Sequence, residues 1–149
     1  MRTVNEEARR AKQIEIMEKC YECYAENGLG AVGVKAVAAA CGCNVASLYQ
    51  YFDNLDDLIV KSTEYCMSKV EDDFMAKAPT DVEDLWRFID EIPHWTAKKH
   101  GKKYRLMYQT TAMSREGSLA RRIIAASTVS TPPVLSMEAK LSAESQVKP

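Results

Sequence analysis

Apolar residues recur along most of the chain at steps of three and four, the spacing of an amphipathic helix, and no stretch has the two-residue alternation of a strand. The pattern therefore predicts an all-α fold. Thr80 and Glu83 have the spacing of a capping box, which would open a helix at Asp81. The predicted helices run from near Thr3 or Asn5 to Asn27, and then over Val34–Ala40, Val45–Phe52, Leu55–Lys77, Asp81–Lys99, Lys102–Met113 and Arg115–Ala126.

Residues that cannot continue a helix, or that cap one, mark the predicted boundaries. Gly42 can adopt the positive φ that ends a helix sharply. Asn44 and Asn54 can each accept a hydrogen bond from the exposed backbone N–H groups of a following helix. Pro93 is expected to kink or split its helix because it lacks a backbone donor, and Gly101 is expected to separate two helices.

The stretch Val34–Phe52 has the pattern of two short helices joined by a tight glycine turn. Helices of about two turns are not stable alone, so the pair is expected to pack as one unit. Two such helices make a helix-turn-helix, whose second helix can enter the major groove of DNA. In that second helix Val45, Leu48 and Phe52 form an apolar face, whereas Ser47, Tyr49 and Gln50 form a polar one.

The composition restricts the class of protein but does not indicate a function. With 46% hydrophobic and 28% charged residues, the chain can bury an ordinary core. The formal net charge of −1 is unlike that of a general nucleic-acid coat, so DNA binding must depend on local geometry and a few phosphate contacts. Because no apolar run is long enough to span a membrane and the polar N-terminus lacks a signal-peptide core, we expect a cytoplasmic protein without a membrane partner.

The five cysteines are an odd number in a chain without a leader, which argues against a disulfide framework. The close pairs Cys20/Cys23 and Cys41/Cys43 leave zinc binding and thiol redox sensing as alternatives. Cysteine also behaves as a small buried apolar residue, and that interpretation is preferred here, so no metal and no cofactor are expected. The sequence contains no nucleophile–base set and no phosphate-binding loop, so it does not predict an enzyme.

One stretch, Ile16–Leu58, resembles the tetracycline-repressor-like (TetR) family of transcriptional regulators, with every spacing kept and no gap. The matching positions are Ile16, Met17 and Cys20, Tyr24 four residues before Gly28, Val37 and Ala38, the run from Cys41 to Asn44, and the closing Leu48-Tyr49-Gln50-Tyr51-Phe52. The resemblance implies a three-helix, helix-turn-helix DNA-binding head on a short all-helical regulatory body. Such a body usually dimerises and holds a pocket for a small-molecule effector.

By this resemblance the third helix reads the DNA groove, and Lys35 is a phosphate clamp. The implied DNA contacts are Lys35, Asn44, Val45, Ala46, Ser47, Tyr49, Gln50 and Tyr51. The chain departs from the family at Gly33, where a hydroxyl residue is usual, and at Leu55, where lysine is usual. The stretch Cys41–Phe52 contains no Lys or Arg, so arginine–guanine pairing is excluded there. A modest affinity that relies on the avidity of a dimer is expected.

The second half of the chain is rich in large amphipathic side chains, which form either a core or, as the resemblance favours, an effector pocket. The pocket residues expected are Trp86, Phe88, His94, Trp95, Tyr104, Met107 and Tyr108. A dense basic cluster lies between Lys98 and Arg105, around Gly101. It is either a solvated turn or a site for an acidic ligand or partner.

The sequence thus predicts a head domain over residues 1–53, a ligand-binding and dimerisation body over 54–126, and a loosely attached tail over 127–149. The predicted function is that of a TetR-like regulator, a repressor that binds a double-stranded DNA operator as a homodimer and is released by an unknown small-molecule effector. The alternative is a helical interaction or ligand-sequestering protein that has lost DNA binding, which the losses at Gly33 and Leu55 favour.

Overall fold

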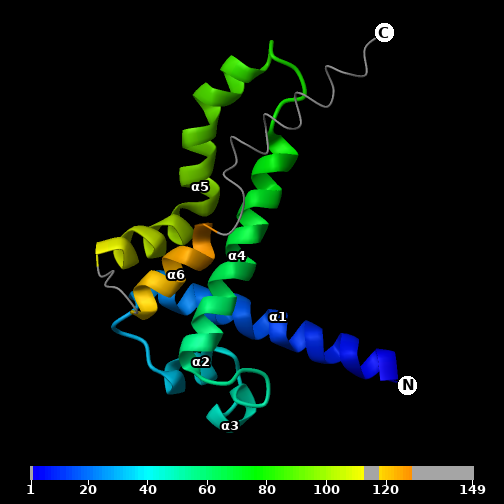
Figure 1. Cartoon of the computed structure of the whole chain (residues 1–149), viewed down its shortest axis with the longest axis vertical. Coiled ribbons are helices and arrows are strands. Elements are labelled where there is room, and N and C mark those ends of the chain that lie inside the picture. Colours follow the sequence, from blue (N-terminus) through cyan, green and yellow to red (C-terminus); the bar gives the residue numbers. More distant parts are fainter. Residues whose placement is uncertain (1, 113–117, 129–149) are drawn as a thin grey trace.

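The computed structural model describes residues 2–112 and 118–128, and within them the chain is entirely helical, as predicted (Figure 1). The helices are α1 (Arg2–Asn27), α2 (Val34–Ala40), α3 (Val45–Leu48), α4 (Leu55–Lys77), α5 (Leu85–Ala112) and α6 (Leu119–Thr128). Within the described ranges, no helix is long and apolar enough to cross a membrane.

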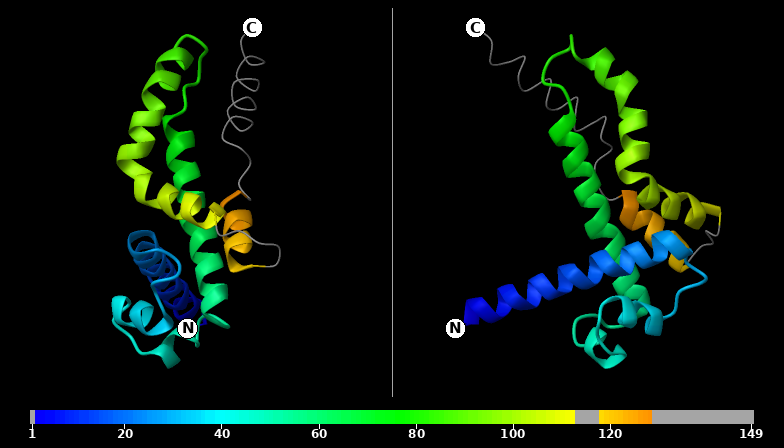
Figure 2. Two further views of the ribbon diagram at one scale, coloured as in Figure 1. Left: turned by 90° about the vertical axis from the view of Figure 1, so that its left-hand side faces the viewer. Right: turned by 180° about the vertical axis from the view of Figure 1, so that it is seen from behind.

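The first three helices form the lower part of the molecule, where α1 lies across α4 and the short α2 and α3 pack beneath it (Figures 1 and 2). Tyr24 of α1 is almost fully buried, and its hydroxyl donates a hydrogen bond to the Val32 carbonyl at 3.0 Å. This contact ties the loop between α1 and α2 to the core. One hydrophobic cluster joins this part to the rest through Ile16, Cys20, Tyr24, Val37, Leu48, Phe52, Leu58, Leu106 and Ile123.

The boundaries predicted from glycine and asparagine in this region are correct. Gly42 has a φ of +64° and separates α2 from α3. The Asn44 side chain accepts a hydrogen bond from the Ser47 backbone N–H at 2.8 Å, and Asn54 does the same for Asp57 at the start of α4. These signals are local, so the sequence alone was sufficient to locate them.

The predicted boundaries in the second half are wrong. α5 begins at Leu85 rather than at Asp81, whose carboxylate accepts a hydrogen bond from the Asp84 N–H at 3.0 Å in the preceding turn. α5 also continues through Pro93 and Gly101, so the two expected helices are one. Figures 1 and 2 show that this helix bends instead of ending: its upper arm runs beside α4 and its lower arm turns across the molecule.

Packing on both sides of the bend explains why α5 persists. On the upper arm, Phe88 is buried and its ring meets that of Phe74 of α4 edge-on at 5.3 Å. On the lower arm, Leu106 is 1% exposed within the shared core. A proline removes one backbone donor, and burial of the two arms outweighs that loss.

The last predicted helix also has different bounds, because α6 spans Leu119–Thr128 instead of Arg115–Ala126. The last residues of this helix are Ser127 and Thr128, which the sequence pattern places in the tail. The rest of the predicted tail lies outside the described residues, and the division into a head of residues 1–53 and a body of 54–126 stays a prediction.

Candidate functional site

α3 contains only four residues, and contacts on its buried side and at both ends hold it in place. Leu48 is 1% exposed within the core. The Asn44 side chain caps the first turn and also contacts the Ser47 hydroxyl at 3.0 Å. We call α3 and the turn that follows it, residues 45–52, the α3 segment. Its opposite side is exposed and includes Ala46, Tyr49 and Gln50. A helix this short has no independent stability, so its orientation is set by these neighbours.

Arg9 of α1 holds the end of the α3 segment through two contacts. Its guanidinium donates a hydrogen bond from Nη2 to the Gln50 carbonyl at 2.9 Å and lies over the Tyr51 ring, 5.3 Å from the ring centroid. One turn further along α1, Gln13 donates to the Tyr51 carbonyl at 3.4 Å. We call Arg9 and Gln13 the α1 clamp. No sequence signal indicates it, because Arg9 and Gln50 are 41 positions apart.

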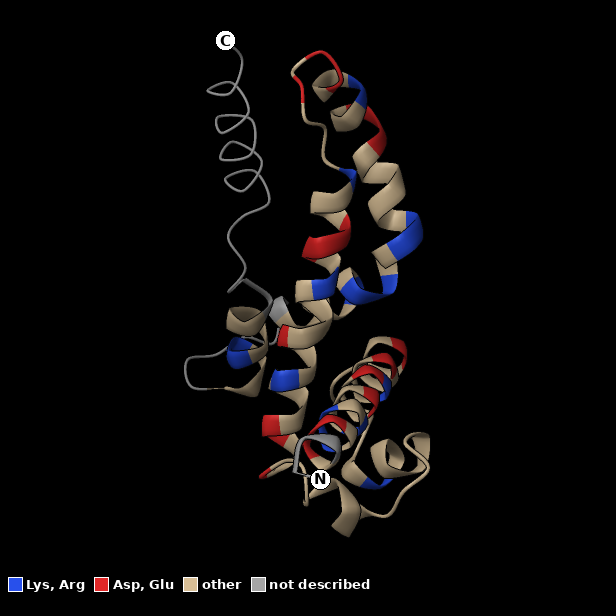
Figure 3. Cartoon of the chain, turned by 90° about the vertical axis from the view of Figure 1, so that its right-hand side faces the viewer, with Lys and Arg blue, Asp and Glu red and all other residues tan. Residues whose placement is uncertain are grey.

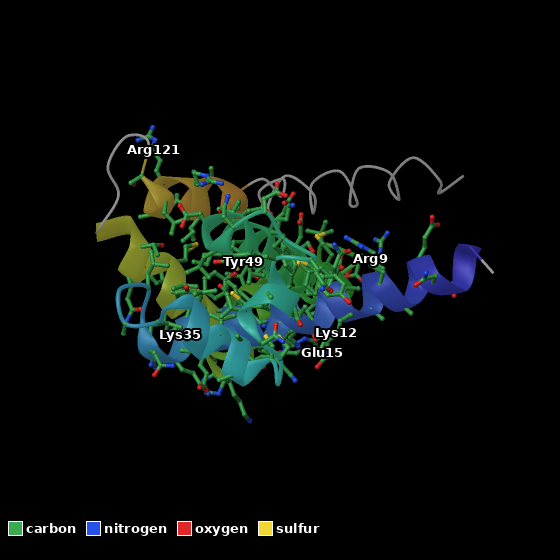
Figure 4. The ribbon with its side chains drawn as sticks, turned by 90° about the horizontal axis from the view of Figure 1, so that it is seen from below. Arg9, Lys12, Glu15, Lys35, Tyr49 and Arg121 are labelled. Carbon is green, nitrogen blue, oxygen red and sulfur yellow. The ribbon has the colours of Figure 1, made fainter. Side chains whose placement is uncertain are left out.

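The predicted DNA contacts fall into two groups by exposure. Val45 and Tyr51 are half-buried and pack against the core, and Ser47 is half-buried with its hydroxyl bonded to the Asn44 side chain. Figure 4 looks at this end from below and shows Lys35 and Arg9 well apart, with Tyr49 labelled between them. The exposed members of the predicted set are Lys35, Asn44, Ala46, Tyr49 and Gln50.

The two family departures have direct structural counterparts. Gly33 is the N-cap residue of α2 and makes no side-chain capping bond. Leu55 is half-buried and packs against the core instead of presenting a charge to solvent. The surface that exposes Lys35 and Tyr49, which we call the lower face, therefore has fewer groups that can bind phosphate than the family pattern described above.

A small charge network on α1 lies beside this face. The Glu15 carboxylate pairs with Lys12 and Lys19 at 2.9 Å each, and these partners lower the pKa of Glu15 to about 2. Figure 4 shows Lys12 and Glu15 near the α3 end of the molecule. Because one carboxylate neutralises part of the charge of two lysines, this network offers phosphate less positive charge than its two lysines alone would.

The cysteines are free thiols, and three of them belong to the core. Cys20, Cys41 and Cys66 are each at most 4% exposed, as the interpretation as packing residues predicted. Burial raises the pKa of Cys20 to about 12 and that of Cys66 to about 11. Across residues 2–112 and 118–128, no three His, Cys, Asp or Glu side chains are grouped as metal ligands would be.

The second half contains an open, largely apolar groove of about 680 Å³ on α5. Tyr104 and Tyr108, both predicted as pocket residues, line it together with Phe74 of α4. The other predicted residues lie elsewhere: Phe88 is buried against α4, Met107 is half-buried, Trp95 contacts His100 edge-on at 5.2 Å, His94 is exposed, and Trp86 is 74% exposed.

A helix-turn-helix mounted on a helical body, with the outer side of its second helix exposed, defines a class of DNA-binding regulators. Comparison with protein families agrees, since residues 16–61 match the family described as bacterial regulatory proteins, tetR family. No curated protein matches the chain. Over these residues the chain therefore resembles the TetR family of transcriptional regulators.

Solved structures of this family have the same fold. A protein assigned to the TetR-family transcriptional regulators from Mesorhizobium loti MAFF303099 aligns with a TM-score of 0.68 at 16% identity, over 92% of this chain and 71% of that one. A TetR-family transcription regulator from Marinobacter aquaeolei VT8 aligns with a TM-score of 0.63 at 18% identity, over 98% of this chain and 72% of that one. At these identities the likeness concerns the fold.

Proposed function

We propose that the protein is a cytoplasmic repressor that binds its operator as a homodimer, without catalytic activity, and leaves the DNA when a small molecule binds the body. The observation that carries the proposal is the exposed side of the α3 segment, held by the Asn44 cap at one end and Arg9 at the other. Two such helices, one from each subunit, would enter successive major grooves about 34–36 Å apart. An effector would favour a spacing that no longer fits.

The chemistry of α3 favours an operator whose contacted bases are A·T pairs. Gln50 is exposed, and a glutamine amide can pair with both N6 and N7 of adenine. The Ala46 methyl group suits the thymine methyl group. Lys35 at the start of α2 would bind a phosphate and so fix the register without reading sequence.

For the effector, we propose the groove on α5 as the binding site. Its walls are mostly apolar, and Tyr104, Tyr108 and Arg105 supply a few polar groups, which suits an apolar or aromatic molecule with one polar end. The remaining predicted pocket residues would take part only if α5 or its surroundings rearranged on binding.

The experiment that tests the DNA-binding proposal is a fluorescence-anisotropy titration of the protein against the upstream region of its own gene at two salt concentrations. Light scattering in the same buffer gives the oligomeric state. The expected result is a dimer whose affinity falls with salt. Replacing Gln50 by Ala in both subunits should lower the affinity by about 5- to 150-fold for each head, from one lost base pairing per head, and by the product of the two factors for the dimer. Lys77→Gln, on α4 far from α3, is the matched control.

One observation favours the alternative of a ligand-sequestering or interaction protein. Gly33 caps α2 without a side chain and Leu55 packs inward, so two phosphate contacts usual in the family are missing. A folded dimer that binds no DNA at either salt concentration, whatever the sequence offered, would replace the repressor proposal with this alternative.

A further inference from the structure

A cleft of about 730 Å³ separates the C-terminal half of α1 from the bend of α5, with part of α4 closing it. It opens on another side of α5 than the apolar groove proposed for the effector, although the two share Ala97, Gly101 and Arg105 at the bend. The lining residues with charged or titratable side chains are Glu18, Tyr21, Glu22, Glu26, Cys66, Lys69, Lys98, Lys99, His100, Lys102, Lys103 and Arg105.

The two long walls of this cleft carry opposite charge. The lining contains six Lys or Arg side chains and three Glu side chains, and five of the six cations come from the bend of α5. Figure 3 shows the blue bend of α5 close to the red-marked end of α1. Lys102 joins the two walls, since its ammonium lies 2.8 Å from the Glu26 carboxylate. An excess of cations therefore remains on the α5 wall.

Some cations of the cleft are already paired and some are not. Lys69 pairs with Glu18 at 2.7 Å, and Lys99 pairs with Asp73, outside the lining, at 2.9 Å. Lys98, Lys103 and Arg105 form no ion pair with any residue in the described part of the chain.

The same wall contains a buried histidine without a hydrogen bond. His100 is 3% exposed, and neither of its ring nitrogens has a hydrogen-bond partner among the described residues. Asp73 is near, with Oδ2 at 3.3 Å from Nε2, but without the geometry of a hydrogen bond. A buried polar group without a partner costs free energy, and a bound ion is one explanation of such a group in a native structure. Burial, reinforced by Lys103 and opposed by Asp73, lowers the pKa of His100.

We propose that this cleft binds a small polyanion, with Lys98, Lys103 and Arg105 pairing with its charged oxygens and His100 donating a hydrogen bond to it. Phosphate and carboxylate groups share this chemistry, because both accept charge-assisted hydrogen bonds from several cations at once. Binding at this place also affects the α1–α5 contact. An anion competes with Glu26 for Lys102, which weakens the ion pair between the two walls.

The regulatory consequence rests on the proposed function, since it requires that the protein bind DNA through its head. α1 carries Arg9, which orients α3, and its other end contacts α5 through the Tyr21 hydroxyl, which donates to the Lys103 carbonyl at 3.0 Å. An anion that pulls on the Lys102 and Lys103 side chains therefore acts at the point where the body meets the helix that holds the DNA-reading segment.

The test is isothermal titration calorimetry of the full chain, without DNA, using pyrophosphate and citrate as separate probes at constant ionic strength. Sodium chloride is the control for general screening. The expected result is saturable binding of one probe per chain, at least about tenfold weaker in the double variant Lys98→Gln/Lys103→Gln from two lost charge-assisted contacts. The matched control, Lys77→Gln, removes one surface lysine outside the cleft and is expected to bind as the wild type does.

The two probes separate phosphate chemistry from carboxylate chemistry, and His100→Gln tests the buried donor if circular dichroism shows that this variant folds. Equal binding in the wild type and in the double variant, or heats that do not saturate with either probe, would overturn the site. Anisotropy with DNA is then measured with and without the probe. Calorimetric binding by a protein that binds no DNA would leave the cleft intact and remove the proposed function, whereas DNA binding without calorimetric binding would do the reverse.

Discussion

Replacing Arg9 should weaken DNA binding through the orientation of α3 rather than through a lost phosphate contact. The guanidinium makes one charge-assisted hydrogen bond to the Gln50 carbonyl and covers the Tyr51 ring. Because both contacts are exposed, we assign about 1 kcal/mol to the hydrogen bond and about 0.5 kcal/mol to the cation–π contact. Their sum, about 1.5 kcal/mol for each head, corresponds to roughly a tenfold loss of affinity per head.

The assay compares Arg9→Lys with Arg9→Gln by fluorescence anisotropy over a range of salt concentrations. Lysine keeps the positive charge but has no planar fork that can bond the carbonyl and stack on the ring together. If Arg9 orients α3, both variants lose a similar factor, up to roughly 100-fold for a dimer with two affected heads, and the salt dependence is unchanged. Arg10→Gln, at the neighbouring exposed position, is the control.

A direct phosphate contact by Arg9 would give a different result. In that case Arg9→Lys would bind nearly as the wild type does, while Arg9→Gln would lower the slope of log affinity against log salt by about one for each head. Observing this pattern would refute the clamp and place Arg9 among the phosphate-binding residues.

Three further predictions concern stability and reactivity. Gly42→Ala should lower the free energy of unfolding, measured in urea, by about 1–2 kcal/mol, because an alanine at this position is held at positive φ. The control variant Gly30→Ala should change the free energy of unfolding little. Equal effects of the two variants would contradict the argument from φ. Cys20 and Cys66 should react with iodoacetamide at pH 8 only as the protein unfolds, after the two half-buried cysteines, since burial keeps their thiols protonated. Because the pKa of His100 is lowered in the folded protein, the unfolded chain binds more protons, and stability should fall as pH falls through about 6.5. In the variant His100→Gln, the stability measured in urea should therefore depend less on pH between about pH 7.5 and 5.5. An unchanged pH dependence in this variant would contradict the argument.

The sequence was sufficient to predict the first half of the fold because the deciding signals there are local. Gly42 needs only its own φ to end α2, and Asn44 caps a helix that starts at the next residue. Each signal acts over three or four residues, which is the range that a sequence pattern describes. The predicted burial of Leu48 and Phe52 is correct, but the predicted helix is too long, because α3 ends at Leu48 and Phe52 lies beyond it.

The second half was predicted less well because distant packing decides it. Pro93 and Gly101 favour an interruption of the helix, but Phe88 and Leu106 are buried on either side of them and keep α5 continuous. Which residues bury those side chains depends on how α4 and α6 pack, and no local spacing describes that. The bend of α5, and with it the cleft, therefore became visible only in the structure.

The candidate sites were likewise predictable only in their local features. The exposed side of α3 follows from the periodicity of four residues, but its orientation depends on Arg9, which lies 41 positions away from the carbonyl that it binds. Likewise, the basic cluster after Lys98 was recognised as a possible anion site, whereas the opposing Glu26 and the buried state of His100 required the packed structure. The geometry of both the α3 site and the cleft therefore depends on contacts between residues that are far apart in the sequence.

A single helix connects these two distant pairings. Arg9 and Glu26 are 17 positions apart in α1, about 26 Å at 1.5 Å per residue, and the intervening residues Ile16, Cys20 and Tyr24 are buried in the shared core. If such a rigid helix tilts about its buried middle, its two ends move in opposite directions. A change in the Lys102–Glu26 contact would therefore reach α3 through the α1 clamp, even though no residue of the cleft touches α3. On this argument the regulatory signal does not require the apolar groove and the DNA-reading segment to be neighbours. It requires only that α1 remain straight between its two contacts.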